Sequence, residues 1–357
     1  MKILTFALLL SITSLAEAVP SMLGLPAMKV PADNPQSTEK IALGKKLFND
    51  KRFSANGSIS CASCHISSKA FTDGRPQAVG IDGLVGQRNS PTIINSAYLN
   101  ELFHDGRRSS LETQALDPLT NPIEHGLTEH SRVIHVIRTD FSYLKDFLNT
   151  FGITAEKINM NYVTKAIASY ERTLISGNTR FDQYFFQSSK KVLTAAEARG
   201  LRLFRRKGNC ANCHEISWDN ALFTDNRFYN IGIGFDALRP VLPAFLKNLK
   251  TDYSSAVAQL DPQQKAQLGR FAVSRQIKDI GAYRTPTLRN IELTAPYMHD
   301  GSISTLRDVI EYYDKGGKKN AFLNPAIFPL HLSEQEKSDL TAFLTSLTDT
   351  SYSKPQH

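Results

Sequence analysis

Two pentapeptides, Cys61-Ala62-Ser63-Cys64-His65 and Cys210-Ala211-Asn212-Cys213-His214, contain all four cysteines of the chain. This Cys-x-x-Cys-His spacing is the pattern of c-type haem attachment, in which both thiols hold the haem and the histidine binds its iron. An exported protein with four cysteines would otherwise suggest two disulfides, and a zinc site is a further alternative. Because two complete motifs use every cysteine, the sequence predicts two covalently bound haem c groups with His65 and His214 as proximal ligands.

The N-terminus has the features of a secretory signal. Lys2 is followed by an apolar run from Ile3 to Leu10 and by small residues that end in Ala16-Glu17-Ala18. We expect residues 1–18 to be a cleaved signal peptide and the mature protein to be periplasmic. The apolar run is shorter than the roughly 20 residues that cross a bilayer, so we predict no membrane span.

Composition and charge indicate a globular protein with room for two domains. The 357 residues are 41% hydrophobic and 21% charged, and the formal net charge is +8. A basic surface favours an acidic protein partner. Because no nucleic-acid motif accompanies the charge, we predict no binding to nucleic acid.

An internal repeat extends well beyond the cysteines. Each half carries, in the same order, a Gly-x-x-Leu-Phe segment, the haem motif, a Pro-Thr pair, His-Asp-Gly thirteen residues after that proline, and leucine twenty residues after it. The first copy has Gly44 to Phe48, Ser90-Pro91-Thr92-Ile93 with Asn95, His104-Asp105-Gly106 and Leu111; the second has Gly200 to Phe204, Thr285-Pro286-Thr287-Leu288 with Asn290, His299-Asp300-Gly301 and Leu306. The two halves are therefore one haem-binding unit used twice.

The secondary-structure signals are mostly helical, with Gly- and Pro-rich loops. Residues 163–174 have a helical pattern, and Thr194 with Glu197 forms a capping box. Ser333 and Glu336 cap a last helix, on which Leu340, Phe343, Leu344 and Leu347 share one face. We predict an all-α fold of two tandem cytochrome c-like domains, residues 19–188 and 189–357, each with one haem and a polar linker near 188–192 between them. Glycine at 44 and 200 would let a second helix cross closely.

The motifs resemble those of the bacterial di-haem cytochrome c peroxidase and MauG family, over nearly the whole mature chain. The segments that carry the resemblance are Leu43-Gly44 to Phe48, Ile59-Ser60-Cys61, Phe71-Thr72-Asp73-Gly74, Arg88-Asn89-Ser90-Pro91-Thr92, Asp105-Gly106-Arg107, Ser169 to Leu174, Pro286 to Asn290 and Leu293-Thr294-Ala295-Pro296-Tyr297-Met298-His299-Asp300-Gly301.

The resemblance implies different coordination at the two haems. In this family the C-terminal haem takes its sixth ligand seventeen residues after the proline of a Thr-x-Pro pair, which here leads from Pro296 to Tyr313. The ligand is Met in the peroxidases and Tyr in MauG. The internal repeat aligns Tyr313 with Pro118, and proline cannot bind iron. We therefore expect a six-coordinate His214/Tyr313 haem and a five-coordinate His65 haem with an open face. A merely buried Tyr313, or Met298 or His299 as ligand, are the alternatives.

The resemblance also implies the acid–base residues of the open haem. The family's Gln and Glu, ten and twenty residues after the Trp of its Phe-Trp-Asp-Gly-Arg motif, correspond to Gln114 and Glu124. Taken alone, a Glu in a Pro-rich loop is more often solvated than catalytic. Because both offsets match the family, we favour a catalytic role for Glu124. The neighbouring His125 is either a second proton-active group or an exposed side chain.

Two departures from the family pattern favour MauG-like behaviour, in addition to Tyr313. His104 stands where the family has the inter-haem Trp, which puts strong charge sharing between the haems in doubt. No histidine lies between His65 and His104. Peroxidases that need prior reduction hold a loop histidine there, so we expect this protein to be ready in its oxidised state.

A calcium site and the single tryptophan complete the predicted sites. The resemblance implies one calcium ion between the domains, with Asn89 and the carbonyls of Thr294 and Pro296 as ligands; oxygen donors suit that cation. The only tryptophan, Trp218, could carry oxidising equivalents outward, but we favour core packing.

Three functions fit the sequence. The favoured one is an enzyme that reacts with hydrogen peroxide at the N-terminal haem and oxidises a periplasmic partner protein through the C-terminal haem. The first alternative is a cytochrome c peroxidase that takes electrons from a small cytochrome or copper protein. The second is a non-enzymatic electron carrier or haem sensor, which would have no use for Gln114, Pro118 and Glu124. The partner is not encoded in the sequence, and the protein is expected to be a monomer or homodimer.

Overall fold

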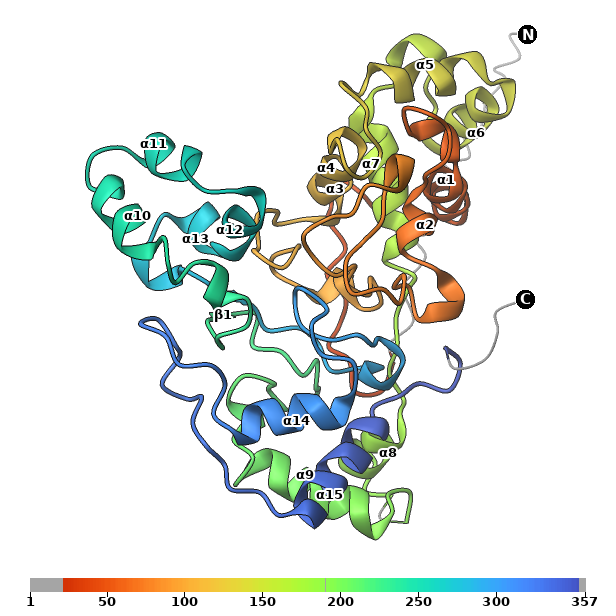
Figure 1. Cartoon of the computed structure of the whole chain (residues 1–357). Helices are drawn as coiled ribbons and strands as arrows, with labels where there is room; N and C mark the ends of the chain where they lie inside the picture. Colours follow the sequence, from red (N-terminus) through yellow and green to blue (C-terminus); the bar gives the residue numbers. More distant parts are fainter. Residues whose placement is uncertain (1–21, 190, 353–357) are drawn as a thin grey trace, which may run out of the picture.

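Helices and long loops make up the computed structural model, which describes residues 22–189 and 191–352 (Figure 1). The helices are α1 (Thr38–Asn49), α2 (Cys61–Cys64), α3 (Leu111–Gln114), α4 (Asp117–Thr120), α5 (Ser131–Thr139), α6 (Phe141–Phe151), α7 (Met160–Glu171), α8 (Arg180–Phe186), α9 (Ala195–Arg205), α10 (Leu242–Leu249), α11 (Tyr253–Ala258), α12 (Pro262–Gln267), α13 (Phe271–Ser274), α14 (Leu306–Asp314) and α15 (Glu334–Thr345). Two-residue strands β1 (Phe228–Tyr229) and β2 (Tyr283–Arg284) pair antiparallel. The predicted helical class is confirmed. The predicted signal peptide lies outside the described residues.

The same helix crossing occurs in both halves. Helix α1 packs on α7, and α9 packs on α15. At each crossing the outer helix contributes a glycine, Gly44 or Gly200, whose added Cβ would overlap the carbonyl oxygen of Ala166 or Asp339. The expected role of both glycines in close helix contact is confirmed, and each crossing holds the helix that leads into a haem motif.

The predicted helix starts are also correct. Thr194 and Glu197 form a capping box at α9, and Ser333 and Glu336 form one at α15. Leu340, Phe343, Leu344 and Leu347 are all buried, as their shared face requires. The helix predicted over 163–174 runs instead over Met160–Glu171. Asn159 caps its start, and beyond its end the Thr173 hydroxyl donates to the carbonyl of Tyr170.

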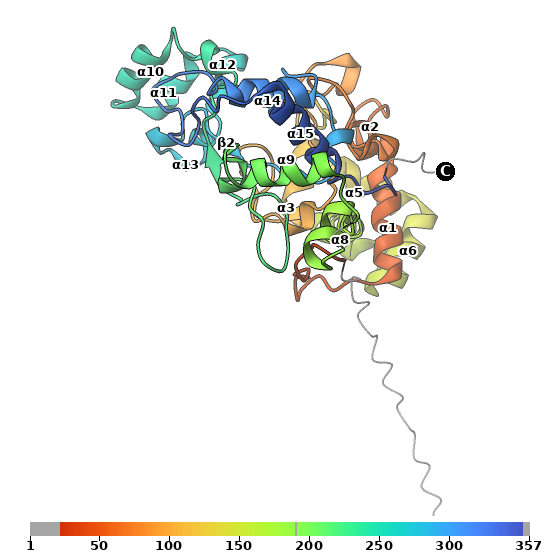
Figure 2. The ribbon, with the colours of Figure 1, turned by 90° about the horizontal axis from the view of Figure 1, so that it is seen from below.

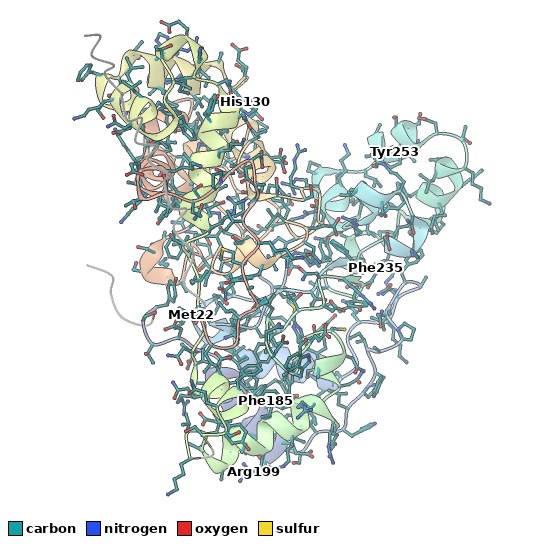
Figure 3. All side chains as sticks on the ribbon, turned by 180° about the vertical axis from the view of Figure 1, so that it is seen from behind. Met22, His130, Phe185, Arg199, Phe235 and Tyr253 are labelled. Atoms are coloured by element: carbon teal, nitrogen blue, oxygen red, sulfur yellow. The ribbon has the colours of Figure 1, made fainter. Side chains whose placement is uncertain are left out.

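Buried apolar residues form separate clusters along the chain. One large cluster draws its buried members from residues 43–174 and another from residues 181–347. A third, built around Phe235, Phe245 and Phe271, is the core of a small helical lobe formed by α10, α11, α12 and α13. This lobe lies at one end of the molecule in the views from below and behind (Figures 2 and 3). The sequence analysis did not predict it.

A fully buried ion pair joins distant segments beneath the second haem motif. Arg289 Nη2 lies 2.8 Å from Asp182 Oδ1, and both side chains are 0% exposed. The same guanidinium donates to the carbonyls of Gly24 and Ala221. Removing either partner would leave an uncompensated buried charge, which typically costs about 3–5 kcal/mol. The loop that follows His214 is therefore fixed at its base. Among the described residues no helix is long and apolar enough to cross a membrane.

We predict that Gly200→Ala destabilises the protein, although alanine favours a helix by about 1 kcal/mol over glycine. The added methyl group must displace the α15 backbone, and overpacking of this kind costs roughly 1–3 kcal/mol. Denaturant unfolding measures the change. Gly86→Ala is the matched control, because the nearest atom to its added Cβ is an ordinary 3.4 Å away. Equal stability of Gly200→Ala and the parent would contradict the close crossing.

Candidate functional site

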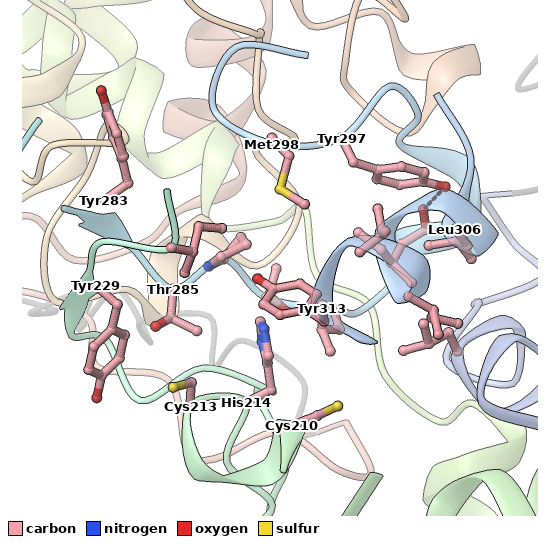
Figure 4. A pocket seen from close by; sticks show the side chains of 18 of the residues that line it. Cys210, Cys213, His214, Tyr229, Tyr283, Thr285, Tyr297, Met298, Leu306 and Tyr313 are labelled. Carbon is pink, nitrogen blue, oxygen red and sulfur yellow. Dashed lines mark hydrogen bonds between the residues drawn. The ribbon is translucent and has the colours of Figure 1, made fainter. Parts of the chain in front are cut away.

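The second haem motif opens into a cavity of about 280 Å³. Cys210, Cys213 and His214 line one side of it, and Met298 and Tyr313 point into it from other segments (Figure 4). Apolar side chains complete the wall, among them Leu288, Ile291, Leu306, Val309, Ile310, Leu340 and Leu344. Two thiols and an imidazole in a largely apolar cavity are what a covalently attached haem requires, so the residues fit this group.

His214 is held with one ring nitrogen free for a metal. Its Nδ1 lies 2.9 Å from the carbonyl oxygen of Phe223. A carbonyl can only accept, so Nδ1 carries the proton and Nε2 keeps its lone pair. Burial lowers the pKa of His214, which favours the neutral imidazole that binds iron.

His65 has the same arrangement in the N-terminal half. Its Nδ1 donates to the carbonyl of Phe71 over 3.1 Å, and burial lowers its pKa. Both acceptors belong to a repeated Phe-Thr-Asp segment, at residues 71–73 and 223–225. Only the first copy was among the segments that carry the family resemblance. That repeat was the signal that could have identified these two carbonyls.

Tyr313 and Pro118 lie on equivalent helices that differ in one respect. Each helix begins at a repeated leucine after a Ser or Thr cap; α14 then runs unbroken from Leu306 to Asp314 and carries Tyr313. In the N-terminal half the same stretch is split into α3 and α4, with Pro118 near the start of α4. Proline lacks the N–H that would continue the helix.

Tyr313, and not its neighbour, faces the cavity. The hydroxyl of Tyr312 donates to the carbonyl of Ile231 over 2.7 Å, so it is already committed. Burial, and then the nearby Cys210 and Cys213, raise the pKa of the Tyr313 hydroxyl above its usual range. A cation in the cavity would instead lower the pKa of this hydroxyl and favour the phenolate.

The two competing ligands have different surroundings. Met298 lines the cavity with its side chain directed inward, so it stays an alternative to Tyr313 (Figure 4). His299 Nε2 instead lies 2.8 Å from Gln267 Oε1, and its ring stacks on Tyr283 with centroids 3.6 Å apart. That bond engages one of the two ring nitrogens of His299.

Glu124 sits in a loop fixed on two sides. Ile81 N–H donates to the carbonyl of Glu124, and Ala55 N–H donates to the carbonyl of His125. The Glu124 carboxylate accepts a 2.6 Å bond from Asn121 Nδ2. Burial raises its pKa, while Arg107 and the Asn121 bond act in the opposite direction. Burial chiefly raises the pKa values of Cys61 and Cys64, and the Glu124 charge adds to both shifts, so the carboxyl lies within electrostatic reach of the first haem motif.

The other predicted distal residues are placed differently. Gln114 ends α3 and is half-buried. His125 is 3% exposed, and its Nδ1 donates to the carbonyl of Phe53 over 3.0 Å. The alternative of an exposed His125 is therefore wrong, because the bond fastens the Glu124 loop to the core.

His104 lies on the wall that both halves share. Its Nε2 donates to the carbonyl of Asn89 over 3.0 Å, and burial lowers its pKa to about 4, so the ring is neutral. His104, Asn89, Thr294 and Pro296 all line the same cavity as His214. The calcium ligands that the resemblance implies stay a prediction, and no cluster of three His, Cys, Asp or Glu side chains suited to a metal occurs in the described part of the chain.

Trp218 corrects one expectation. Its side chain is 88% exposed, so the favoured interpretation as a core residue is wrong. The loop that carries it is anchored at Ala221, whose N–H donates to the carbonyl of Gly24. A large aromatic side chain on a fixed loop close to His214 is available for contact with another molecule.

The fold and paired motifs agree with the comparisons to known proteins. The structure is similar to the crystal structure of a MauG-like protein associated with microbial copper homeostasis, with a TM-score of 0.77 and 34% identity over 93% of this chain and 95% of that one. The family model of di-haem cytochrome c peroxidases matches residues 38–190.

Full-length relatives extend this match. The cytochrome-c peroxidase IdrP1 of Pseudomonas sp. (strain SCT) is 38% identical over 344 residues, 93% of this chain and 87% of that protein. The methylamine utilization protein MauG of Methylorubrum extorquens is 36% identical over 319 residues, 89% of this chain and 80% of that protein. The chain belongs to the di-haem cytochrome c peroxidase family. The predicted family and enzyme class are confirmed.

One buried carboxyl near the first motif was missed by sequence reasoning. Glu171, in α7, is 5% exposed, and its Oε2 has no hydrogen-bond partner among the described residues. Burial raises its pKa from an ordinary 4.5 to about 8, with the Arg172 charge acting in the opposite direction. Apolar spacing cannot reveal it, because its helix is buried on nearly every side.

We predict that Glu171→Gln removes a pH dependence of stability. The folded protein keeps a proton that the unfolded chain loses, so the free energy of unfolding falls as pH rises from 4.5 to about 8 and is level above. The slope is at most about 1.4 kcal/mol per pH unit. Denaturant unfolding at several pH values measures the difference between variant and parent. The exposed Glu215→Gln is the control; an unchanged slope in Glu171→Gln would contradict the protonated carboxyl.

Proposed function

We propose that this protein reduces hydrogen peroxide at the His65 site and transmits oxidising equivalents through the His214 site to a partner protein. The observation that carries the proposal is the difference between equivalent positions, Pro118 in one half and Tyr313 in the other, together with the half-buried Glu124 near the first motif. A pure electron carrier needs neither an open position nor an acid–base group. We assign the two sites to domains 19–188 and 189–357, each with one haem c.

A haem held by Cys61, Cys64 and His65 would supply the iron centre at which peroxide accepts electrons. The chain supplies the proton transfer. The Glu124 carboxylate accepts the proton of the inner peroxide oxygen and delivers it to the outer one, with Gln114 orienting the substrate. A raised pKa suits a group that must both take up and release a proton. The balance is one peroxide, two protons and two electrons to two waters.

The two electrons come from the partner, and here two sources compete. We favour oxidation of a residue within a partner protein, as in MauG, because Tyr313 faces His214 where the peroxidases have Met. Exposed Trp218 offers a contact close to that haem. The alternative is a small cytochrome or copper protein as reductant; relatives named cytochrome-c peroxidase and relatives named MauG both occur at similar identity.

The remaining assignments follow the same family. Asn89, Thr294 and Pro296 would hold calcium through oxygen atoms, which that cation prefers. The predicted signal peptide would deliver the protein to the periplasm. There the partner would be another exported protein, and the net charge of +8 would favour an acidic one.

Tyr313→Met should convert the second site to His/Met coordination and raise the reduction potential of its haem, because a thioether stabilises ferrous iron better than a phenolate does. Low-temperature electron paramagnetic resonance of the ferric parent should show one high-spin and one low-spin haem. Tyr312→Phe is the matched control, since it removes a neighbouring hydroxyl that donates to the carbonyl of Ile231. If Tyr313→Met leaves spectrum and potential unchanged, Met298 becomes the preferred ligand.

Glu124→Gln should leave both haem spectra intact and slow the reaction with peroxide by ~10²–10⁴-fold, the usual worth of general acid–base assistance. The amide keeps the size of the side chain but cannot accept the proton. Stopped-flow mixing with hydrogen peroxide measures the rate.

Glu129→Gln is the control for this experiment, because Glu129 lies five residues away in an exposed position. A Glu124→Gln protein that reacts as fast as the parent would show that the carboxyl is a bystander.

A further inference from the structure

The repeated His-Asp-Gly turns each pack against the opposite half of the chain. A Cβ added at Gly106, in the first turn, would overlap the ring of Phe228 and the guanidinium of Arg270. A Cβ added at Gly301, in the second turn, would overlap the backbone of Pro76. Both glycines have positive φ, at 71° and 67°. The turns that carry His104 and His299 therefore form part of the contact between the halves.

One short segment at the base of the helical lobe reaches both turns. Arg270 Nη1 donates to the carbonyls of Asp105 and Gly106 over 3.1 and 2.8 Å. Its Nη2 lies 2.8 Å from Glu101 Oε1, and its guanidinium stacks over Phe228 at 4.2 Å. The rigid fork of arginine makes all these contacts at once, which a lysine cannot do. The first turn is thereby fixed to the lobe.

Gln267, three residues earlier, fixes the second turn. Its Oε1 accepts the 2.8 Å bond from His299 Nε2 and a 3.2 Å bond from the Tyr283 hydroxyl. The side chain is 5% exposed, and Tyr283 stacks on the His299 ring. The His299 ring is thus held by an acceptor at its edge and by an aromatic ring on its face.

A third bond links the two attachments. Arg88 Nη1 lies 2.7 Å from Asp105 Oδ2, while its Nη2 donates to the carbonyl of Ala266 over 3.1 Å. Residues 266–270 therefore connect both turns through buried or half-buried bonds. His104, Tyr283 and His299 all line the cavity of the second haem motif, which also touches Thr72 and Pro91 of the first half.

We propose that Gln267 and Arg270 are positioning residues, which set the His104 and His299 rings between the two haem sites and thereby the rate of electron exchange between the haems. This inference rests on the proposed two-haem function. By the family resemblance His104 stands where a larger indole ring would bridge the haems, so the exchange depends on how its smaller ring is placed by groups outside the turn. Arg270 of the lobe is the common hydrogen-bond donor to two carbonyls of the first turn. Without it, the lobe no longer fixes the position of that turn.

The test is the rate of electron redistribution between the haems after rapid reduction by one electron, followed by absorption. Arg270→Gln and Gln267→Met should each slow it by roughly tenfold or more, since positional errors of about 1 Å cost rate factors of that order. Arg270→Lys, with the charge but not the fork, should be intermediate. Electron paramagnetic resonance of both ferric haems should be unchanged in all three variants.

Arg275→Gln is the matched control, because Arg275 lies in the same lobe and stacks on Tyr253 at 3.4 Å. Its redistribution rate should stay within about twofold of the parent, since it touches neither turn. Parent-like rates in both Arg270→Gln and Gln267→Met would overturn the proposal, as would an equal loss in Arg275→Gln. If Arg270→Gln does not fold, Arg270→Lys and Gln267→Met decide the question. A parent protein with one haem would instead refute the proposed function.

Discussion

The hydrogen bond from each motif histidine to a phenylalanine carbonyl is the constraint on which the rest of the structure depends. It fixes the tautomer of His65 and His214 and leaves Nε2 as the only nitrogen that can bind iron. Each carbonyl must therefore lie about 3 Å from a ring that itself follows directly after a haem cysteine. The close helix crossings at Gly44 and Gly200 serve this requirement, because they hold the helix that leads into each motif.

The two halves share this proximal arrangement and differ on the opposite side. The helix that begins at Leu306 continues to Tyr313, whereas the equivalent helix after Leu111 is broken before Pro118. One residue thus changes both the side chain offered to the cavity and the course of the backbone. Around the first motif the chain instead gathers two acids, the half-buried Glu124 and the buried Glu171, whose pKa values burial raises. Carboxyl groups with raised pKa values are suited to holding or moving protons.

The hydrogen bonds that hold the two His-Asp-Gly turns depend on a lobe that lies outside the repeat. Arg270 and Gln267 satisfy backbone and imidazole groups that would otherwise be buried without partners. The placement of His104 at the inter-haem position stays a prediction from the sequence, which contains no local signal for the groups that hold its turn. The lobe has no counterpart in the first half, so comparison of the two halves could not reveal it.

The sequence by itself determined the haem motifs, the helix caps, the glycine crossings and the alignment of Tyr313 with Pro118, because these depend on spacing along the chain and on local chemistry. Only the tertiary structure decided burial. His125 is buried, so the alternative of an exposed side chain is wrong. Trp218 is exposed, so the favoured interpretation as a core residue is wrong. Exposure depends on which distant segments cover a residue, and the Phe53 carbonyl that receives His125 lies 72 residues away. The same reason hid Glu171 and the contacts of Arg270, whose partners are separated from them by up to 169 positions.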